Sequence, residues 1–311
     1  MKIRRFLFAL ATSVFAASAA VPVVAGPIII AGTDADDHGF ASGGVNETGW
    51  FFMQRAFENL APAVSNGNKV AVCIGCNGSQ AQSAFDSAVA LSSLVGSGWS
   101  TANLTSLADI SGFFDGTGSR NTGNSGILYM PTVSSNVGGG INDSQLGIVN
   151  GFGSVINNFI IAGGGLFTQE QANSGIGYGW LTSLLPGISV NGDNNGSPFN
   201  SSSLTLTPAV TAAFPSLTDS IISAATPWHA YFTGNFGSLT TLVTGPIANN
   251  APGSVVLGGG AGGAIICGTP GAPACPVDPT VPEPSSWVML IAGFGLVGTM
   301  MRRRHIATVA A

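Results

Sequence analysis

The chain has 311 residues, of which 45% are hydrophobic, 7% are charged and 45 residues are glycine. Of its nine Lys and Arg residues, only Arg55, Lys69 and Arg120 lie between the two ends of the chain, and acidic residues outnumber them there. This composition excludes a nucleic-acid-binding protein, because such proteins need clustered cations to replace phosphate counterions. The surface of the body must instead consist largely of Ser, Thr, Asn and Gly.

The first 25 residues have the order of a secretory signal peptide. Residues 2–5 carry three cations, residues 6–15 are apolar, and residues 17–19 and 23–25 both place small residues at the spacing that signal peptidase needs. We therefore expect an exported protein that signal peptidase cleaves. A permanent membrane anchor at this end is the weaker alternative, because the apolar stretch is short and ends in a cleavage pattern.

The first half of the body alternates between strand and helix patterns. Residues 28–32 and 69–74 are short apolar runs rich in β-branched residues, which is typical of buried strands. A helical stripe lies between them, and a second stripe, which Ser79 could cap, follows the second run. The two stripes consist of Trp50, Met53, Phe57 and Leu60, and of Ala81, Phe85, Ala88 and Leu91.

The second half continues this alternation. Residues 127–130 form the next apolar run, and a helical pattern then starts at Asp143 and runs through Phe159 until glycines 163–165 stop it. Further strands are expected at residues 166–168, 204–206, 239–243 and 254–257, and a further helix at residues 178–185. This alternation predicts one α/β domain, residues 26–267, with a mostly parallel sheet flanked by helices. An all-β exported adhesin would explain the Ser, Thr and Gly content but not the helical stripes.

An acidic cluster follows the first predicted strand directly. Asp34, Asp36, Asp37 and His38 lie in the sequence GTDADDHG. In an open α/β sheet, ligands bind at the carboxyl ends of the strands, so this is a suitable place for a site. The carboxylates could bind Ca²⁺, or a transition metal if His38 joins them, or could perform acid–base chemistry on a carbohydrate. The alternative is a polar turn, because Asp-rich turns form for local hydrogen-bonding reasons.

Two further residues could join this cluster. Glu170 follows the predicted strand at residues 166–168, and His229 is the other body histidine. Trp228 and Tyr231 beside it could form a sugar-stacking platform, or could belong to the core. The candidate catalytic residues are therefore Asp34, Asp37, His38, Glu170 and His229, and the candidate metal ligands are Asp34, Asp36 and Asp37.

Four cysteines are present, an even number that favours disulfides in an exported protein. Proximity pairs Cys73 with Cys76 and Cys267 with Cys275. A redox-active C-x-x-C motif or a zinc site are the alternatives.

One stretch of the body resembles the glutamine amidotransferase-like superfamily. Residues 156–187 are INNFIIAGGGLFTQEQANSGIGYGWLTSLLPG, and they are similar to the helix, glycine turn and strand after the central sheet of its trehalose-utilisation-like branch. Residues 214–232 resemble the segment in which that branch carries a histidine. The resemblance implies a flavodoxin-like order of strands. The sequence has no nucleophile elbow G-x-[CS]-x-G, so amidotransferase or hydrolase chemistry of that superfamily does not follow.

The end of the chain combines Val281, Pro282, Glu283 and Pro284 with an apolar stretch at residues 287–301 and a cluster of arginines, Arg302, Arg303 and Arg304. This three-part order resembles the PEP-CTERM sorting signal of Gram-negative bacteria. The resemblance implies cleavage near Pro-Glu-Pro by an exosortase-type protease, after an inner-membrane intermediate held by the apolar stretch as a transmembrane helix. The arginines would then stop transfer and stay cytoplasmic.

The tail therefore divides into a Pro- and Gly-rich linker at residues 268–280, a sorting signal at residues 281–305 and a cytoplasmic tail at residues 306–311. A plain C-terminal anchor is the alternative, although the apolar stretch is short for the ~20 residues of a membrane-spanning helix.

Together these features predict a non-enzymatic cell-surface or extracellular-matrix protein, and the PEP-CTERM resemblance implies an association with exopolysaccharide and biofilm. It would have no cofactor other than a possible Ca²⁺ ion. The alternative is a secreted carbohydrate-active hydrolase or lyase that uses the acidic and histidine residues at the strand ends. A Ca²⁺-dependent module that uses the Asp cluster alone is a third possibility.

Overall fold

The structure is a computed structural model that describes residues 26–76, 80–133, 139–170, 175–192, 203–224, 228–247 and 251–259. All of them belong to one compact unit, Val23–Pro276. The predicted signal peptide, linker and sorting tail, and with them Cys267 and Cys275, lie outside the described residues. Within the described part of the chain, every helix is too short or too polar to cross a membrane.

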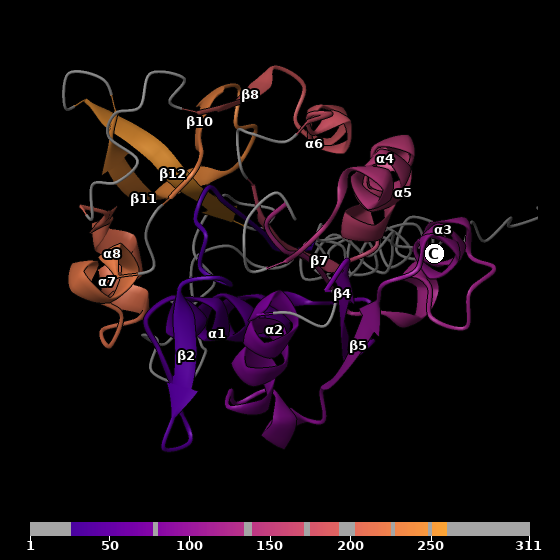
Figure 1. Ribbon diagram of the computed structural model, residues 1–311, viewed down its shortest axis with the longest axis horizontal. Coiled ribbons are helices and arrows are strands. Elements are labelled where there is room, and N and C mark those ends of the chain that lie inside the picture. The colour runs from indigo at the N-terminus through magenta and orange to yellow at the C-terminus, as the bar shows by residue number, and fades with distance from the viewer. Residues whose placement is uncertain are drawn as a thin grey trace, which may run out of the picture. The chain divides into compact units, whose positions relative to one another are not determined.

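Ten strands form one mixed sheet within these residues (Figure 1). They are β1 (Ile28–Ala31), β4 (Val70–Ile74), β5 (Ser100–Leu104), β6 (Ile127–Met130), β7 (Gly165–Gln169), β8 (Ile188–Asn191), β9 (Thr205–Leu206), β10 (Tyr231–Gly234), β11 (Thr240–Pro246) and β12 (Pro252–Gly259). A separate hairpin consists of β2 (Gly39–Ser42) and β3 (Val45–Glu47).

The sheet has a parallel half and an antiparallel half. Strands β5, β4, β6, β7 and β1 are parallel and lie side by side in that order. Counted from β4, this is the flavodoxin-like order 2-1-3-4-5, with the N-terminal strand β1 in the last position. Beyond β1, strands β12, β10 and β8 continue the sheet, and β11 and β9 branch from β12, all in antiparallel pairs. The predicted α/β class is confirmed, whereas the antiparallel extension was not expected from the sequence.

Helices cover both faces of the sheet (Figure 1). They are α1 (Thr48–Leu60), α2 (Gln80–Ala90), α3 (Leu107–Asp115), α4 (Asp143–Gly151), α5 (Gly153–Ile161), α6 (Gly179–Leu184), α7 (Pro208–Ala213) and α8 (Asp219–Ser223), with 3-10 turns at Ala61–Ala63, Val95–Ser97 and Thr122–Asn124. Helices α1, α2, α7 and α8 pack on one face and α3 to α6 on the other, so that two hydrophobic cores enclose the sheet.

The first predicted stripe is the centre of one core. Trp50, Met53, Phe57 and Leu60 are all buried on α1. The Phe57 ring lies edge-on to three other buried aromatic rings, those of Phe85, Tyr129 and Phe167, at 5.4–5.6 Å between centroids. Such edge-to-face packing adds to the burial of apolar area. It fixes α1 across the parallel half of the sheet.

The bounds of two predicted helices differ from the sequence-based expectation. The helical pattern from Asp143 to Phe159 forms two helices, α4 and α5, because the chain leaves helical geometry at Phe152 between two glycines. Leu91, expected in the buried stripe of α2, lies beyond the helix and is 36% exposed. The sequence therefore located α1, α2, α4, α5 and α6 but not all of their ends, and it missed α3, α7 and α8.

A disulfide bond joins Cys73, on β4, to Cys76. Both cysteines are fully buried, and this pairing was predicted. Reactive cysteines occupy partly exposed positions, so the burial favours a structural bond over a redox centre.

Candidate functional site

The predicted acidic residues lie in a tight turn at the carboxyl end of β1. The N–H groups of Asp37 and His38 both donate to the carbonyl oxygen of Asp34 at 3.2 Å. His229 reaches the same place from the antiparallel half, because its N–H donates to the carbonyl oxygen of Gly32 at 2.8 Å. A Cβ atom on Gly32 would lie 1.9 Å from the carbonyl oxygen of Ala230, so this close approach requires glycine.

Asp34 connects the two histidines. Its side chain is fully buried, and its Oδ2 atom lies 3.1 Å from Nε2 of His229 and 3.3 Å from Nε2 of His38. The imidazoles themselves are partly exposed. The hydrogen bond to Asp34 raises the pKa of His38, and the negative charges of Asp34 and Asp37 add to this rise, while partial burial opposes it. The structure therefore brings together four of the five candidate catalytic residues.

Asp36 is the second fully buried carboxyl group. Its Oδ2 atom accepts hydrogen bonds from the backbone N–H and the hydroxyl group of Thr132, at 3.2 and 2.9 Å. Desolvation raises its pKa well above the usual value, and the charges of Asp34 and Asp37 raise it further. Asp36 thus holds a proton to a higher pH than an ordinary aspartate does.

Asp34, Asp36 and Asp37 each place a carboxylate oxygen within 4.8 Å of the others. Ca²⁺ binds oxygen ligands at about 2.3–2.6 Å, so two ligands on opposite sides of the ion are roughly 5 Å apart. The three oxygens are therefore close enough to bind one ion together. We call Asp34, Asp36 and Asp37 the acidic triad.

Glu170 lies at the same edge of the sheet but has other partners. It follows β7, and its N–H donates to the carbonyl oxygen of Ala31 at 2.7 Å. The Thr168 hydroxyl group donates to its carboxylate, and Tyr178 bonds to it as well. Burial raises the pKa of Glu170 to about 8. In the described part of the chain, its carboxylate bonds to these two side chains rather than to the acidic triad.

The N-terminus of α1 holds the turn from the opposite side. The Thr48 hydroxyl group donates to the carbonyl oxygen of His38 at 2.8 Å, and the Trp50 indole donates to that of Asp36 at 3.0 Å. A Cβ atom on Gly49 would lie 2.3 Å from the carbonyl oxygen of Ala35. Thr48 has a φ of 52°, a left-handed conformation that costs about 1–3 kcal/mol and that its neighbours must maintain. Tertiary contacts thus determine the conformation of the turn.

The residues beneath the turn were not predicted from the sequence. The Gln169 side chain accepts hydrogen bonds from the Thr33 hydroxyl group at 3.1 Å and from the Ala35 N–H at 2.9 Å, and it donates to the Tyr129 hydroxyl group at 2.7 Å. Thr132 supports Asp36 in a similar way. Thr132 and Gln169 lie just after the strands predicted at residues 127–130 and 166–168. This position at the carboxyl end of a parallel strand was the one signal that could have identified them.

The sugar-stacking platform predicted at Trp228 and Tyr231 is not supported. Trp228 is fully buried and forms a bridge to Thr33, with its ring packed against Gly245. Tyr231 is half-buried on β10. The core alternative therefore holds for Trp228, because a fully buried ring has no face left for a sugar.

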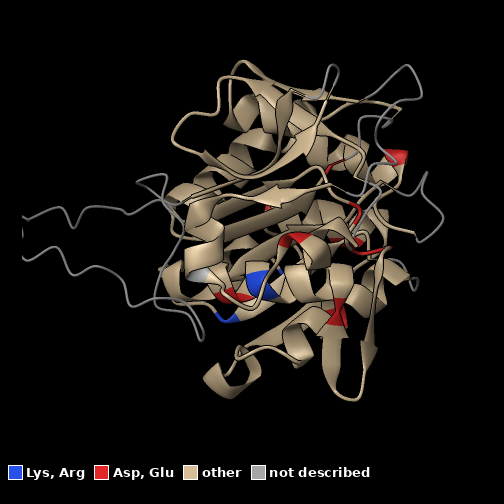
Figure 2. Cartoon of the chain, turned by 90° about the vertical axis from the view of Figure 1, so that its left-hand side faces the viewer, with Lys and Arg blue, Asp and Glu red and all other residues tan. Residues whose placement is uncertain are grey.

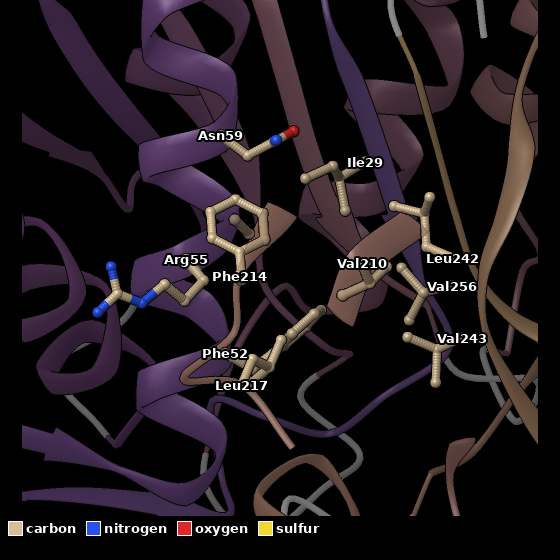
Figure 3. Close-up of a pocket in the computed structure, with 11 residues that line it drawn as sticks. Ile29, Phe52, Arg55, Asn59, Val210, Phe214, Leu217, Leu242, Val243 and Val256 are labelled. Carbon is tan, nitrogen blue, oxygen red and sulfur yellow. The ribbon is translucent and has the colours of Figure 1, made fainter. Parts of the chain in front are cut away.

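An apolar pocket lies away from this site, between α1, the α7 segment and strands β1, β11 and β12 (Figure 3). Its cavity volume is about 30 Å³, which is room for about two water molecules rather than for a ligand. The guanidinium group of Arg55 points away from it and pairs with Glu58. Ligand pockets combine apolar walls with polar groups that orient the ligand. Asn59 lines this pocket, but its volume is too small for a ligand, so we place the candidate site at the acidic triad.

We predict that Glu170→Gln makes the protein less sensitive to rising pH. With a folded pKa of about 8 against 4.5 for the free side chain, folding takes up a proton between these values, so stability falls across this range as pH rises. The glutamine cannot ionise, so at pH 8 the variant should keep on the order of several kcal/mol of unfolding free energy that the wild type loses. Urea denaturation at pH 5 and pH 8 measures this difference.

Glu47→Gln, at an exposed position of strand β3, is the control for removal of a charge and should follow the wild type. Equal loss of stability between pH 5 and pH 8 in the Glu170→Gln variant and the wild type would contradict the assignment of a protonated Glu170.

No curated protein and no solved structure matches the chain, so the amidotransferase-like resemblance of the body has no support from relatives. Residues 280–304 match the model of the PEP-CTERM protein-sorting motif. The chain therefore carries a PEP-CTERM signal, which implies export and exosortase-dependent sorting to the cell surface of a Gram-negative bacterium.

Proposed function

We propose that the body is an extracellular binding module that holds a divalent cation, Ca²⁺ above all, at the acidic triad and associates with the exopolysaccharide matrix at the cell surface. The sorting signal supplies the location, and the triad supplies the chemistry. The main support for the cation site is that three carboxylates lie within 4.8 Å of one another and that two of them are fully buried.

The electrostatics of the triad favour a cation. Buried carboxylates are costly unless they are paired or bind a metal. Burial disfavours the charged form of Asp36, and this raises its pKa in the absence of an ion. A divalent ion that displaced the Asp36 proton would neutralise two of the three carboxylate charges. Carboxylate ligands suit Ca²⁺ and Mg²⁺ better than they suit softer metals.

The composition of the body suits a neutral, hydrated matrix. Figure 2 shows that charged residues occupy few segments of a chain in which other residue types dominate. Hydroxyl and amide side chains are the groups that such a surface offers to polysaccharide hydroxyl groups. This composition supports weak, repeated contacts with an exopolysaccharide rather than tight binding of one charged ligand.

We predict that Ca²⁺ raises the melting temperature of the protein and that a chelator reverses the rise, because an ion that binds only the folded state stabilises it by mass action. At about 100-fold excess over the dissociation constant, the gain is about 2.7 kcal/mol. Thermal denaturation with and without Ca²⁺ measures it.

The double variant Asp34→Asn with Asp37→Asn should remove this gain. Its matched control is Asp109→Asn with Asp115→Asn, two exposed aspartates of α3, which should keep the gain. A Ca²⁺-dependent shift of unchanged size in the Asp34/Asp37 variant would place the ion elsewhere.

A second candidate function, a carbohydrate-active hydrolase or lyase, is favoured by a specific observation. Asp34 contacts Nε2 of His229, which orients this partly exposed imidazole as a general base. Glu170, with a pKa of about 8, is protonated at neutral pH and could serve as a general acid. The chain would then need a substrate that reaches both groups.

Release of reducing ends from isolated exopolysaccharide separates the two functions. For the binding module, we predict no release above the level of the His229→Gln variant. Release that this substitution lowers by about 10²-fold or more, the usual contribution of a general base, would instead establish the enzyme. The Ca²⁺-dependent shift, measured on the same variant, shows whether the triad is intact.

For the tail, we propose that residues 287–301 hold the exported protein in the inner membrane until processing, after signal peptidase has removed residues 1–25. Cleavage at the sorting motif should leave a mature protein that ends near Pro284. Mass spectrometry of the protein from the cell surface measures both ends. A surface protein that retains Arg302, Arg303 and Arg304 would contradict processing at this motif.

A further inference from the structure

Gln169 connects the acidic triad to the sheet beneath it. It is the last residue of β7, it is 1% exposed, and it lies opposite Ala31 in the parallel pairing of β7 with β1. Its side chain is therefore level with the end of β1 and lies beneath the turn that continues from it. Each of its hydrogen-bond partners, Thr33, Ala35 and Tyr129, is fully buried.

The bond to Ala35 has a direct consequence for the triad. Ala35 lies between Asp34 and Asp36, and its N–H belongs to the peptide group that follows Asp34. When Oε1 of Gln169 accepts from this N–H at 2.9 Å, it fixes the orientation of that peptide group. The second bond, from the Thr33 hydroxyl group at 3.1 Å, fixes the residue before Asp34 in the same way.

The Tyr129 hydroxyl group completes the arrangement. It accepts from Nε2 of Gln169 at 2.7 Å. The Ala35 N–H, which can only donate, determines which end of the amide faces the turn, since the two hydroxyl groups can donate or accept. Tyr129 is itself held in the aromatic cluster around Phe57. The Gln169 amide thus connects the turn to the core of the sheet, in addition to the bonds that Thr48, Trp50 and Thr132 make with it.

We infer that Gln169 is the positioning residue of the acidic triad: it holds residues 33–35 so that Asp34 and Asp36 converge. That loss of Gln169 weakens cation binding rests on the function proposed above. That loss of Gln169 loosens the turn does not. Side chains that support metal ligands typically contribute about 10- to 100-fold in affinity.

Gln145 offers a matched control elsewhere in the fold. It is also buried, at 2% exposure, and it also uses both ends of its amide. Its Oε1 atom accepts from the Asn142 N–H at 2.9 Å, and its Nε2 atom donates to the carbonyl oxygen of Thr105 at 2.7 Å. Replacing it removes a buried glutamine of the same kind without touching the turn.

The experiment compares Gln169→Leu with Gln145→Leu in the full protein through two measurements. The first is hydrogen exchange of the Ala35 amide, and the second is the Ca²⁺ concentration at half-maximal stabilisation. We expect Gln169→Leu to remove the protection of Ala35 and to raise this Ca²⁺ concentration about tenfold or more. Gln145→Leu should leave both at the wild-type values even if it lowers the melting temperature as much.

Wild-type protection of Ala35 in the Gln169→Leu variant would overturn the inference. So would a Ca²⁺ response that Gln145→Leu weakens equally. If the wild type shows no Ca²⁺ response, the proposed function fails, and the exchange of Ala35 alone decides the role of Gln169. If Gln169→Leu does not fold, Thr33→Val removes one of the two bonds to the turn, and the same measurements decide, with a smaller expected change.

Discussion

Two fully buried carboxyl groups, those of Asp34 and Asp36, lie at the carboxyl end of β1 in a body that has few cations to offset them. Lys69 and Arg120 donate to carbonyl oxygens, and Arg55 pairs with Glu58. Burial of such groups is unfavourable unless hydrogen bonds, protons or metal ions compensate for it. In the structure the compensation comes from two imidazoles, from Thr132 and from the raised pKa of Asp36. A cation would replace the proton and provide the compensation directly.

The topology of the sheet explains why these groups meet. Parallel strands present their carboxyl ends at one edge, so the ends of β6, β7 and β1 supply Thr132, Gln169 and the triad from distant parts of the sequence. The antiparallel half adds His229, because the segment before β10 bonds to Gly32 at the end of β1. The strained Thr48 and the close contact at Gly49 then fix the turn from above. The site is therefore a product of both halves of the sheet.

The sequence predicted the parts of the fold whose apolar patterns are strong. Strands β1, β4, β6 and β7 and the stripe of α1 were identified, as was the position of Asp34 after β1. Strand β5 was missed because its sequence, STANL, is as polar as a loop. It can be polar because it lies at the edge of the sheet. The contact between His229 and Asp34 depends on the antiparallel extension, of which local patterns predicted strands β9, β11 and β12 but not their pairing. Gln169 was missed for a different reason, since a single glutamine gives no signal until its neighbours in space are known.

The PEP-CTERM motif gives the protein a destination at the cell surface, and the acidic triad gives it a candidate chemistry there. The most direct test is a titration of the protein with Tb³⁺, an oxygen-binding analogue of Ca²⁺ whose emission increases when a nearby indole is excited. Because the Trp50 indole donates to the carbonyl oxygen of Asp36 at 3.0 Å, an ion in the triad would lie beside it. We predict saturable, indole-sensitised emission that Ca²⁺ competes away and that Trp50→Phe strongly reduces. Absent emission, or emission that the double variant Asp34→Asn with Asp37→Asn leaves unchanged, would contradict a cation site at the triad.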